Sequence, residues 1–228
     1  MSTQVHASID EATVRQISEE LDEPEWLLQT RLQALEALED LDYPDVIRTP
    51  GRTWTDLTEL DFDALVDPLG AKEQKDQVGP EGIEVLSIAE AIDAHGDLLE
   101  EHFGSVIDPE KNYLTALSTA LFTTGTVVYV PEGVDAEDVT IRTTTNSRSL
   151  FNYTLVVTEQ SSSVTILERQ ETGDDVDGNR YYSGIVEIVA GENSYVQYGG
   201  LQDTGRARGR ADKRGRPTPR RRGACRHG

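Results

Sequence analysis

The amino-acid sequence predicts an α+β fold that is helical in its first part and built from β-strands after Gly125. Three observations lead to this expectation. The first 42 residues carry helix-capping patterns and a leucine stripe at helical spacing. After Gly125, β-branched and aromatic runs alternate with short clusters of polar residues and glycine. Within that part, strand–turn–strand units of similar sequence recur at a nearly constant spacing, which is typical of repeat architectures.

Residues 1–42 form the predicted helical N-terminal region. Ser8 and Glu11 have capping-box spacing, and Asp22 and Glu25 repeat it at the start of a second helix. The second helix carries an apolar stripe formed by Leu28, Leu32 and Leu35, with Trp26 beside it. This pattern favours an amphipathic hairpin that packs on itself or on the next domain. The alternative is a detachable arm that binds a partner.

Residues 43–82 are acidic, contain few apolar residues and are punctuated by proline and glycine. Proline and glycine interrupt regular structure, so we expect an irregular linker or covering segment here. Residues 83–124 follow as an α/β segment that leads into the core, and its run "IEVLS" at 83–87 predicts a short strand.

Two helices are expected after that strand. Ser87 and Glu90 have the capping-box spacing and open a helix that reaches about Phe103. Asp108, followed by proline, opens a second helix through "NYLTALSTALFT", and Gly125 is expected to stop it.

Residues 125–203 contain six predicted strands separated by Gly, Ser, Asn, Asp or Glu clusters. The strand runs are 126–130, 139–143, 149–159, 163–169, 181–190 and 194–199. Val130, Val157 and Val189 mark equivalent points of a recurring unit, 27 and then 32 residues apart, and the longer step carries the insert "ETGDDVDGNR". Recurrence at this period favours a β-solenoid whose units stack to bury a continuous core. A β-sandwich or jelly roll is the competing interpretation, because similar strand spacing serves both.

Charge is the strongest compositional feature of the chain. Residues Met1 to Asp203 hold 11 Lys or Arg and 41 Asp or Glu, a balance of 11 − 41 = −30. Such self-repulsion destabilises a compact fold at low ionic strength and is screened at molar salt. We interpret the acidity as adaptation to a salt-rich cytoplasm, and a polyacidic binding surface is the alternative. No apolar run is long enough to cross a bilayer and no export signal is recognisable, so the expected location is the cytoplasm.

Sequence motifs for catalysis and metal binding are scarce. No phosphate-binding Gly-rich loop with Lys–Ser/Thr and no Gly-x-Ser-x-Gly motif occurs. Cys225 is the only cysteine, which excludes a disulfide within the chain and a cysteine-ligated zinc or iron–sulfur site made by this chain alone. His95 and His102 could share a helix face but lack a third ligand, so we interpret them as surface histidines.

Two further patterns are interpreted without a functional role. The carboxylates of "GDDVDGNR" lack the ligand spacing of a calcium loop, so we expect a solvated loop. Asn152 begins a glycosylation sequon, but it lies in a predicted strand. The sequence therefore predicts no catalytic, cofactor-binding or metal-ligating residues.

Four stretches resemble the SufB/SufD family of iron–sulfur cluster assembly scaffolds. They are "DEPEWLLQTRLQALEAL", "YLTALSTALFTTGTVVYVPEGV", "FNYTLVVTEQSSSVTILERQ" and "GENSYVQYGGLQD". The resemblance is strongest to the SufD branch, and the acidic composition points to a member from a halophilic archaeon. It implies a helical N-terminal region followed by the first rungs of a right-handed parallel β-helix. It also implies a non-enzymatic scaffold subunit of the SufBCD complex, with a SufB-like subunit and a SufC-like ATPase as partners. The intact complex would handle an iron–sulfur cluster, and this chain alone would bind no cofactor.

The sequence departs from the family's pattern after Asp203. Family members continue with many more β-rungs and with a terminal helical domain that docks the ATPase. The Cys and His residues implicated in cluster handling lie in that part, so no residue role is carried over. We therefore expect a truncated family member, poorly stable and prone to aggregation because its last rung lacks a cap.

The segment 204–228 has a different composition, with ten Lys or Arg and one acid. A frameshift is the favoured interpretation, because GC-rich acidic codons read in another frame give Arg, Thr, Gly, Ala and Pro. A disordered extension and a nonspecific nucleic-acid-binding arm are the alternatives. For the whole chain, the alternative functions are a β-solenoid enzyme acting on polysaccharide through a carboxylate pair, and nucleic-acid binding through this tail.

Overall fold

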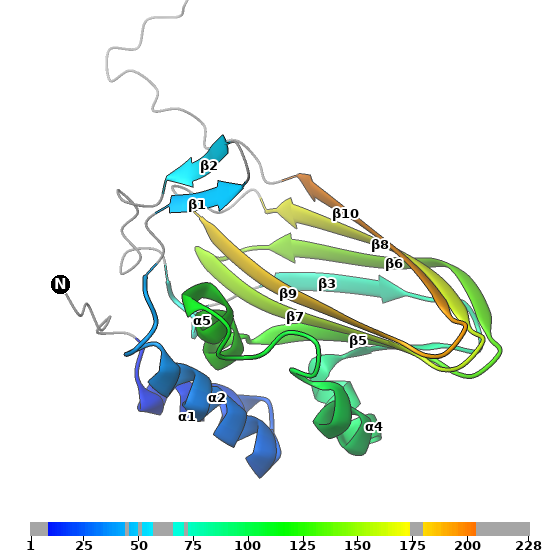
Figure 1. The fold of residues 1–228 in the computed structure, drawn as a ribbon, viewed down its shortest axis with the longest axis horizontal. Coiled ribbons are helices and arrows are strands. Elements are labelled where there is room, and N and C mark those ends of the chain that lie inside the picture. The colour runs from blue at the N-terminus through cyan, green and yellow to red at the C-terminus, as the bar shows by residue number, and fades with distance from the viewer. Residues whose placement is uncertain are drawn as a thin grey trace, which may run out of the picture.

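A computed structural model of the chain describes residues 9–43, 46–49, 52–56, 66–70, 73–173 and 180–203. The fold is mixed α+β: two four-stranded sheets lie one on the other, and the helices pack against one of them (Figure 1). The helices are α1 (Glu11–Glu20), α2 (Glu25–Ala37), α4 (Ile88–His102) and α5 (Tyr113–Leu121). Among the described residues, no helix is long and apolar enough to cross a membrane.

The described residues contain ten strands. They are β1 (Val46–Thr49), β2 (Arg52–Asp56), β3 (Glu73–Val78), β4 (Glu84–Ser87), β5 (Thr124–Val130), β6 (Asp135–Thr145), β7 (Ser149–Thr158), β8 (Ser163–Thr172), β9 (Tyr181–Ala190) and β10 (Tyr195–Asp203). One sheet has the order β10-β8-β6-β3 and the other β4-β5-β7-β9, while β1 and β2 form a separate two-stranded ribbon. All six strands predicted after Gly125 are present.

The long strands pair in parallel. β5, β7 and β9 form one parallel ladder, and β6, β8 and β10 form the other. β5, β7 and β9 each continue through a short turn into the opposite sheet, as β6, β8 and β10, and the three units so formed stack on one another. This pairing agrees with the solenoid interpretation and differs from the antiparallel pairing of a sandwich or jelly roll. The right-handed sense of the stack stays a prediction.

The register differs from the sequence estimate by one residue in one unit. Val157 pairs with Val189 as expected, but its partner in β5 is Tyr129, whereas Val130 pairs with Thr158. Valine occurs at 127, 128 and 130, so the apolar pattern does not distinguish these registers, and the pairing of the turns decides between them.

The turns from β5 to β6, from β7 to β8 and from β9 to β10 share one backbone feature. The third turn residue has a positive φ each time: 72° at Gly133, 57° at Ser161 and 57° at Asn193. Neighbouring turns bond through the backbone, because Gly133 N donates to Gln160 O at 3.1 Å and Ser161 N to Glu192 O at 2.9 Å. Gly and Asn tolerate this left-handed conformation best, which explains the Gly and Asn at these positions.

Alternation along the strands creates two cores. Val128, Val156 and Ile166 lie between the two sheets in the smaller core. Neighbouring residues such as Val127 and Leu155 face the opposite way and join the larger core under the helices. The sheet that contains β7 is consequently covered on both faces, and every residue of β7 is buried.

Antiparallel strands close the first end of the stack. β3 pairs antiparallel with β6, and β4 pairs antiparallel with β5. The prediction of an irregular segment over 43–82 differs from the structure here, since β1, β2 and β3 lie within that range. The sequence "EQKDQV" of β3 has almost no strand propensity, and pairing with β6 is what makes it a strand.

Helix ends were predicted correctly only in part. The Ser87–Glu90 capping box is present, and α4 ends at His102 with Phe103 as its C-cap, as expected. The expected cap at Asp22 is wrong, since α2 is preceded by Pro24 without a side-chain cap. Asp10 caps α1 by accepting from Thr13 N at 2.8 Å, and Ser8 lies outside the described residues.

The second predicted helix of the α/β segment is shorter than expected. It begins after Asn112, which accepts a bond from Thr115 N at 3.1 Å, and it ends before Phe122. Gly125 does not stop the helix but belongs to β5.

Candidate assembly surface

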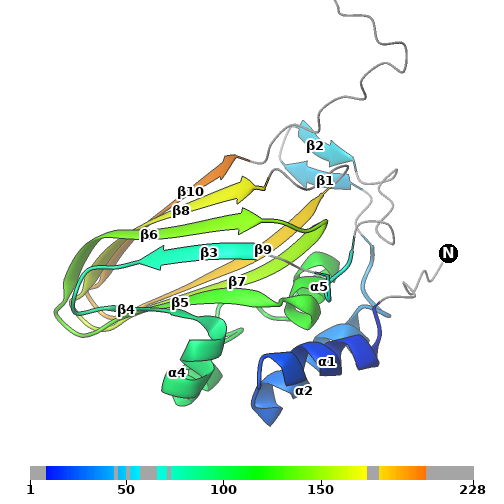
Figure 2. The ribbon, with the colours of Figure 1, turned by 180° about the vertical axis from the view of Figure 1, so that it is seen from behind.

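None of the helices in the described part of the chain covers the outer face of the β3-β6-β8-β10 sheet (Figure 2). We call it the outer sheet face. Four large apolar side chains are exposed on it, and they are four of the seven such side chains among the described residues. They are Val78, Leu167, Tyr195 and Leu201. An uncovered sheet face with grouped apolar residues is typical of a surface that contacts another macromolecule.

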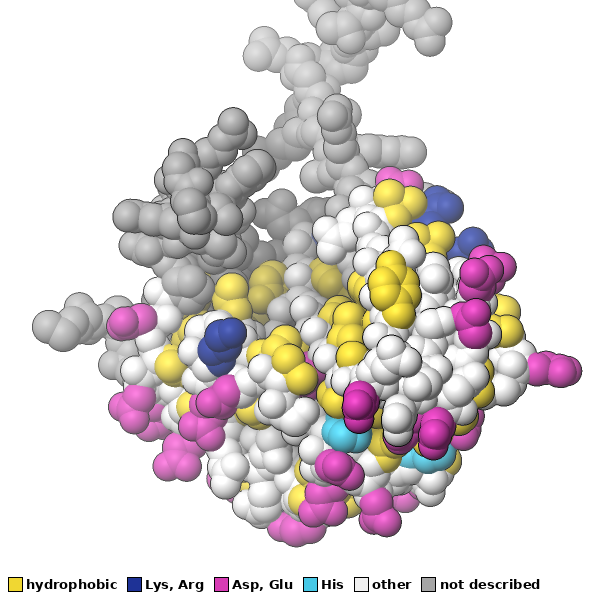
Figure 3. All heavy atoms as spheres, turned by 45° about the vertical axis from the view of Figure 1, so that its right-hand side comes forward, with side chains coloured by type: hydrophobic (Ala, Val, Ile, Leu, Met, Phe, Trp, Pro, Cys, Tyr) yellow, Lys and Arg dark blue, Asp and Glu magenta, His cyan; other side chains and the backbone are white. Residues whose placement is uncertain are grey.

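Charged residues of both signs border these apolar residues. Asp76, Arg142, Arg169 and Leu201 stand in register across the four strands. Arg169 forms an ion pair with Glu171. It also lies 3.8 Å from an Asp203 oxygen. The side of the molecule in Figure 3 carries many Asp and Glu side chains and few Lys or Arg. The outer sheet face is therefore amphipathic.

The last unit of the stack presents two strand edges. Within the described residues, β9 and β10 each pair with another strand on one side only. An edge strand offers its unpaired N–H and C=O groups to a further strand. These edges and the outer sheet face are the two surfaces from which the stack could be extended or bound.

Glu187 fixes the loop between α4 and α5 to β9. Its side chain is fully buried, and its two oxygens accept from Gly104 N at 2.8 Å, Val106 N at 3.0 Å and Ile107 N at 2.7 Å. Tyr153 donates its hydroxyl to the same carboxylate. Burial, reinforced by the nearby Glu187 charge, raises the pKa of Tyr153, so the phenol keeps its proton and donates.

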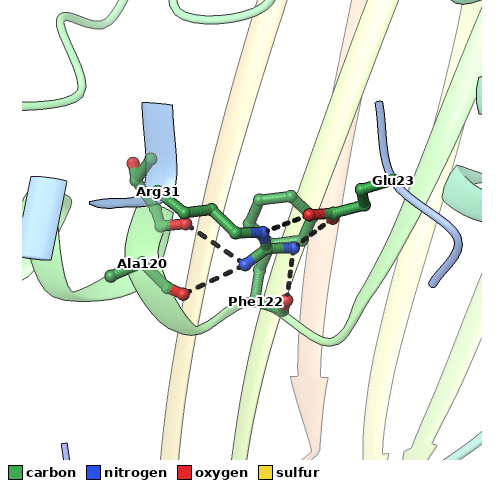
Figure 4. A network of polar contacts seen from close by, with 5 residues as sticks. Glu23, Arg31, Ala120 and Phe122 are labelled. Atoms are coloured by element: carbon green, nitrogen blue, oxygen red, sulfur yellow. Dashed lines mark hydrogen bonds and ion pairs between the residues drawn. The ribbon is translucent and has the colours of Figure 1, made fainter. Parts of the chain in front are cut away.

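Arg31 joins α2 to the end of α5 (Figure 4). The guanidinium is fully buried and binds Glu23 through two hydrogen bonds of 2.7 and 2.6 Å. It also donates to Ala120 O at 3.1 Å and Phe122 O at 2.9 Å, and its central carbon lies 3.6 Å from the centre of the Phe122 ring. Burial lowers the pKa of Arg31, and Glu23 opposes this shift. Positive charge at a helix C-terminus stabilises the helix, so Arg31 caps α5.

His95 and Asn152, two residues singled out from the sequence, each bond a nearby side chain. His95 lies where α4 departs from helical geometry, at φ −138° and ψ 40°, and its Nε2 is 2.8 Å from Glu84 Oε2. Asn152 is buried in β7, and its Nδ2 donates to Thr154 Oγ1 at 3.1 Å. A glycosylating enzyme therefore cannot reach this side chain in the folded protein. Among the described residues, no group of three or more His, Cys, Asp or Glu could hold a metal ion. Residues 174–179 and Cys225 lie outside the described part.

The architecture defines a class of protein: a stack of strand–turn–strand units with a helical layer on one side and an open amphipathic face on the other. Comparison with known proteins then assigns the family. Residues 56–141 match the model of the SufBD protein N-terminal region, and residues 141–215 match that of the SufBD core domain of the SUF system for FeS cluster assembly. The chain belongs to the SufBD family.

Individual relatives agree with this assignment. The iron–sulfur cluster assembly protein SufD of Bacillus subtilis is 31% identical over 235 residues, which cover 86% of this chain and 53% of that protein. An iron–sulfur cluster assembly SufBD family protein of Synechocystis is 28% identical over 241 residues, covering 86% of this chain and 50% of the relative. The chain thus spans about half the length of these curated relatives.

Proposed function

We propose that the chain acts as a SufD-like scaffold subunit in a complex that assembles iron–sulfur clusters. The observation that carries this proposal is the unbroken family match over residues 56–215, which covers α4, α5 and the whole described stack. Relatives of similar sequence are named as iron–sulfur cluster assembly proteins. A scaffold needs surface and rigidity, and it needs no catalytic residues.

The structure supplies features that suit this role. The outer sheet face and the β9 and β10 edges are surfaces that a partner can bind. Arg31 joins two helices of the helical layer, and Glu187 joins that layer to the third unit of the stack. We propose that the stack is a right-handed parallel β-helix, as the right-handed preference of β-crossover connections favours.

The proposed partners are a SufB-like subunit and a SufC-like ATPase. The cluster is the cargo of the complex, and we propose that this chain alone binds none and catalyses no reaction. Glu168 and Glu187, the carboxylates buried in the described part of the stack, each accept several hydrogen bonds, which suits a structural role. The tail on which nucleic-acid binding would depend lies outside the described residues.

Co-expression tests the proposal. The affinity-tagged chain is produced with untagged SufB-like and SufC-like proteins from one organism and purified at molar salt. We expect the SufB-like protein to co-elute in a fixed ratio, because the stack offers it both a face and two edges. An unrelated acidic protein of similar charge, tagged in the same way, is the control. Recovery of the chain without either partner, or equal recovery with the control, would refute the assignment.

A further inference from the structure

The space between the two sheets is not apolar along its whole length. Near the turns it is filled by the smaller core, but towards the other end of β8 the inward side chains are polar. Glu168 and Gln170 both point inward, because they continue the alternation of Val164 and Ile166, and they are 3% and 9% exposed. A carboxylate buried in this way must be compensated.

Hydrogen bonds to Glu168 compensate it only in part. Gln170 Nε2 donates to Glu168 Oε1 at 3.0 Å, and the Tyr198 hydroxyl donates to Oε2. Gln202 Nε2 donates in turn to Gln170 Oε1 at 3.0 Å. Gln170 Nε2 also lies 2.7 Å from the Tyr182 hydroxyl, to which it donates, so the amide is shared between Glu168 and Tyr182. Burial and the Glu168 carboxylate raise the pKa of Tyr198, which keeps this donor protonated. The two side chains that donate to Glu168, Gln170 and Tyr198, are both neutral.

A second buried oxygen faces the same space. Thr143 is fully buried on β6, directly beside Gln170 in the parallel register, and its hydroxyl has no hydrogen-bond partner among the described residues. On the other side of Glu168, the register partner in β10 is Gly200. A Cβ added to Gly200 would meet no atom within 4 Å, so there is room above the carboxylate, and this residue is exposed. The glycine thus leaves an approach from solvent to the buried oxygens.

We propose that Glu168 and Thr143 hold a small alkali cation, potassium or sodium, inside the stack between β6, β8 and β10. The ligand atoms would be the carboxylate and hydroxyl oxygens, which are hard ligands that suit alkali cations and not soft metals. One carboxylate carries a single charge and so matches a monovalent ion, whereas calcium sites in proteins use several carboxylates. The cation neutralises the buried charge and gives the free Thr143 hydroxyl a partner. This proposal is independent of the assembly function.

The test is unfolding of the full chain at constant ionic strength. Urea unfolding is measured in potassium chloride, in sodium chloride and in tetramethylammonium chloride, whose cation is too large to enter. We expect stabilisation by an alkali cation that saturates with concentration. At ten times the dissociation constant, binding to the folded state alone lowers the unfolding equilibrium constant about tenfold.

Three variants locate the effect. Glu168→Gln removes the charge with little change of shape, and Thr143→Val removes the hydroxyl; both should reduce or abolish the difference between the salts. Glu171→Gln is the matched control, because Glu171 lies on the same strand but points outward. An identical result for all salts in the unmodified chain would overturn the proposal, and so would a difference that persists in Glu168→Gln.

A direct measurement covers the case in which Glu168→Gln does not fold. Crystals of the unmodified chain soaked in rubidium chloride should show an anomalous peak in contact with the oxygens of Glu168 and Thr143. An ordinary water molecule at that position, or the absence of any peak there, contradicts cation binding.

Discussion

At the scale of single residues, two buried charges hold the helical layer in place. Arg31 satisfies carbonyl groups at the end of α5, and Glu187 satisfies three backbone N–H groups of the loop before it. Both are therefore bound to main-chain groups that would otherwise be buried without partners. The burial of Glu187 has one sign in the sequence, because this acid lies inside the apolar run "GIVEIVA". No pattern in the sequence distinguishes Arg31 from the arginines of a helix surface.

Replacement of Arg31 tests the first of these contacts. Arg31→Met leaves the Glu23 carboxylate buried without its partner, which should lower the free energy of unfolding by about 3–5 kcal/mol. The double variant Arg31→Met with Glu23→Leu should recover much of that loss. Arg15→Met removes the exposed Arg15–Glu11 pair and should cost at most about 1 kcal/mol. Urea unfolding measures all three, and equal losses for the two single variants would show that Arg31 is not a structural anchor.

Buried tyrosines predict a loss of stability in alkali. Burial raises the pKa of Tyr153, Tyr181 and Tyr198. The folded state therefore retains protons that the unfolded state releases near pH 10. This stabilisation is complete below pH 10 and is lost as the pH rises through the folded-state values.

Urea unfolding between neutral pH and pH 12 measures this effect, with tyrosinate absorbance as the second signal. Tyr153→Phe should make the decline with pH shallower, since it removes one titrating group. Tyr195→Phe, at an exposed position, is the matched control. A free energy of unfolding that stays constant above pH 10 would be inconsistent with buried phenols.

At the scale of elements, the start of α4 offers a test of helix capping. The Ser87 hydroxyl and backbone N–H bond the Glu90 carboxylate, and these bonds lower the pKa of Glu90. The stabilisation is present above the ordinary pKa of glutamate and is lost as the pH falls through the lowered value. Ser87→Ala should raise the pKa of Glu90 and cost about 1 kcal/mol. Carbon NMR titration of the carboxyl group follows the shift, and an unchanged titration would rule out the capping box.

The parallel pairing of β5 and β7 depends on Gly125. A Cβ at this position would lie 2.5 Å from the carbonyl oxygen of Tyr153, which is closer than atoms can approach. Gly125→Ala should therefore destabilise the fold by about 1–3 kcal/mol. Gly199→Ala is the control, because its Cβ would meet Leu167 at an ordinary 3.7 Å. The two variants are compared by urea unfolding, and similar stability would contradict this close approach of strands.

Elements with a strong local pattern could be predicted, and those made by pairing could not. The six strands after Gly125 follow from β-branched and aromatic runs, whose preference for extended structure is local. β3 lacks such a pattern and forms only because β6 offers its edge. The N-cap residue is Asp10 for α1 and Pro24 for α2, which differs from the residues expected from capping-box spacing. Several residues near the start of each helix could take this position, and spacing alone does not distinguish them. The inward direction of Glu168 follows from the alternation of side chains along β8. Which of the two alternating sets faces inward is known only once the pairing register of the strand is known.

At the scale of the whole molecule, net charge predicts a strong dependence on salt. A balance of −30 over Met1 to Asp203 gives a self-repulsion that is felt over about 10 Å at 0.1 M salt and about 3 Å at 1 M. We expect the free energy of unfolding in urea to rise steadily with salt up to about 1 M. This general effect is the same for salts of any monovalent cation, which separates it from the binding proposed at Glu168. Stability that is independent of salt would contradict the interpretation of the acidic surface.

The central claim is that three strand–turn–strand units stack in parallel, and cysteine cross-linking of the turns tests it most directly. In a Cys225→Ser background, cysteines are placed pairwise at 133, 161 and 193. Turns of neighbouring units lie one strand spacing apart, about 4.8 Å, which a disulfide can span, whereas the first and third lie about 10 Å apart. The account predicts rapid intramolecular cross-links for the pairs 133–161 and 161–193 and none for 133–193. Cross-linking of 133–193, or failure of both neighbouring pairs, would contradict the stacked arrangement.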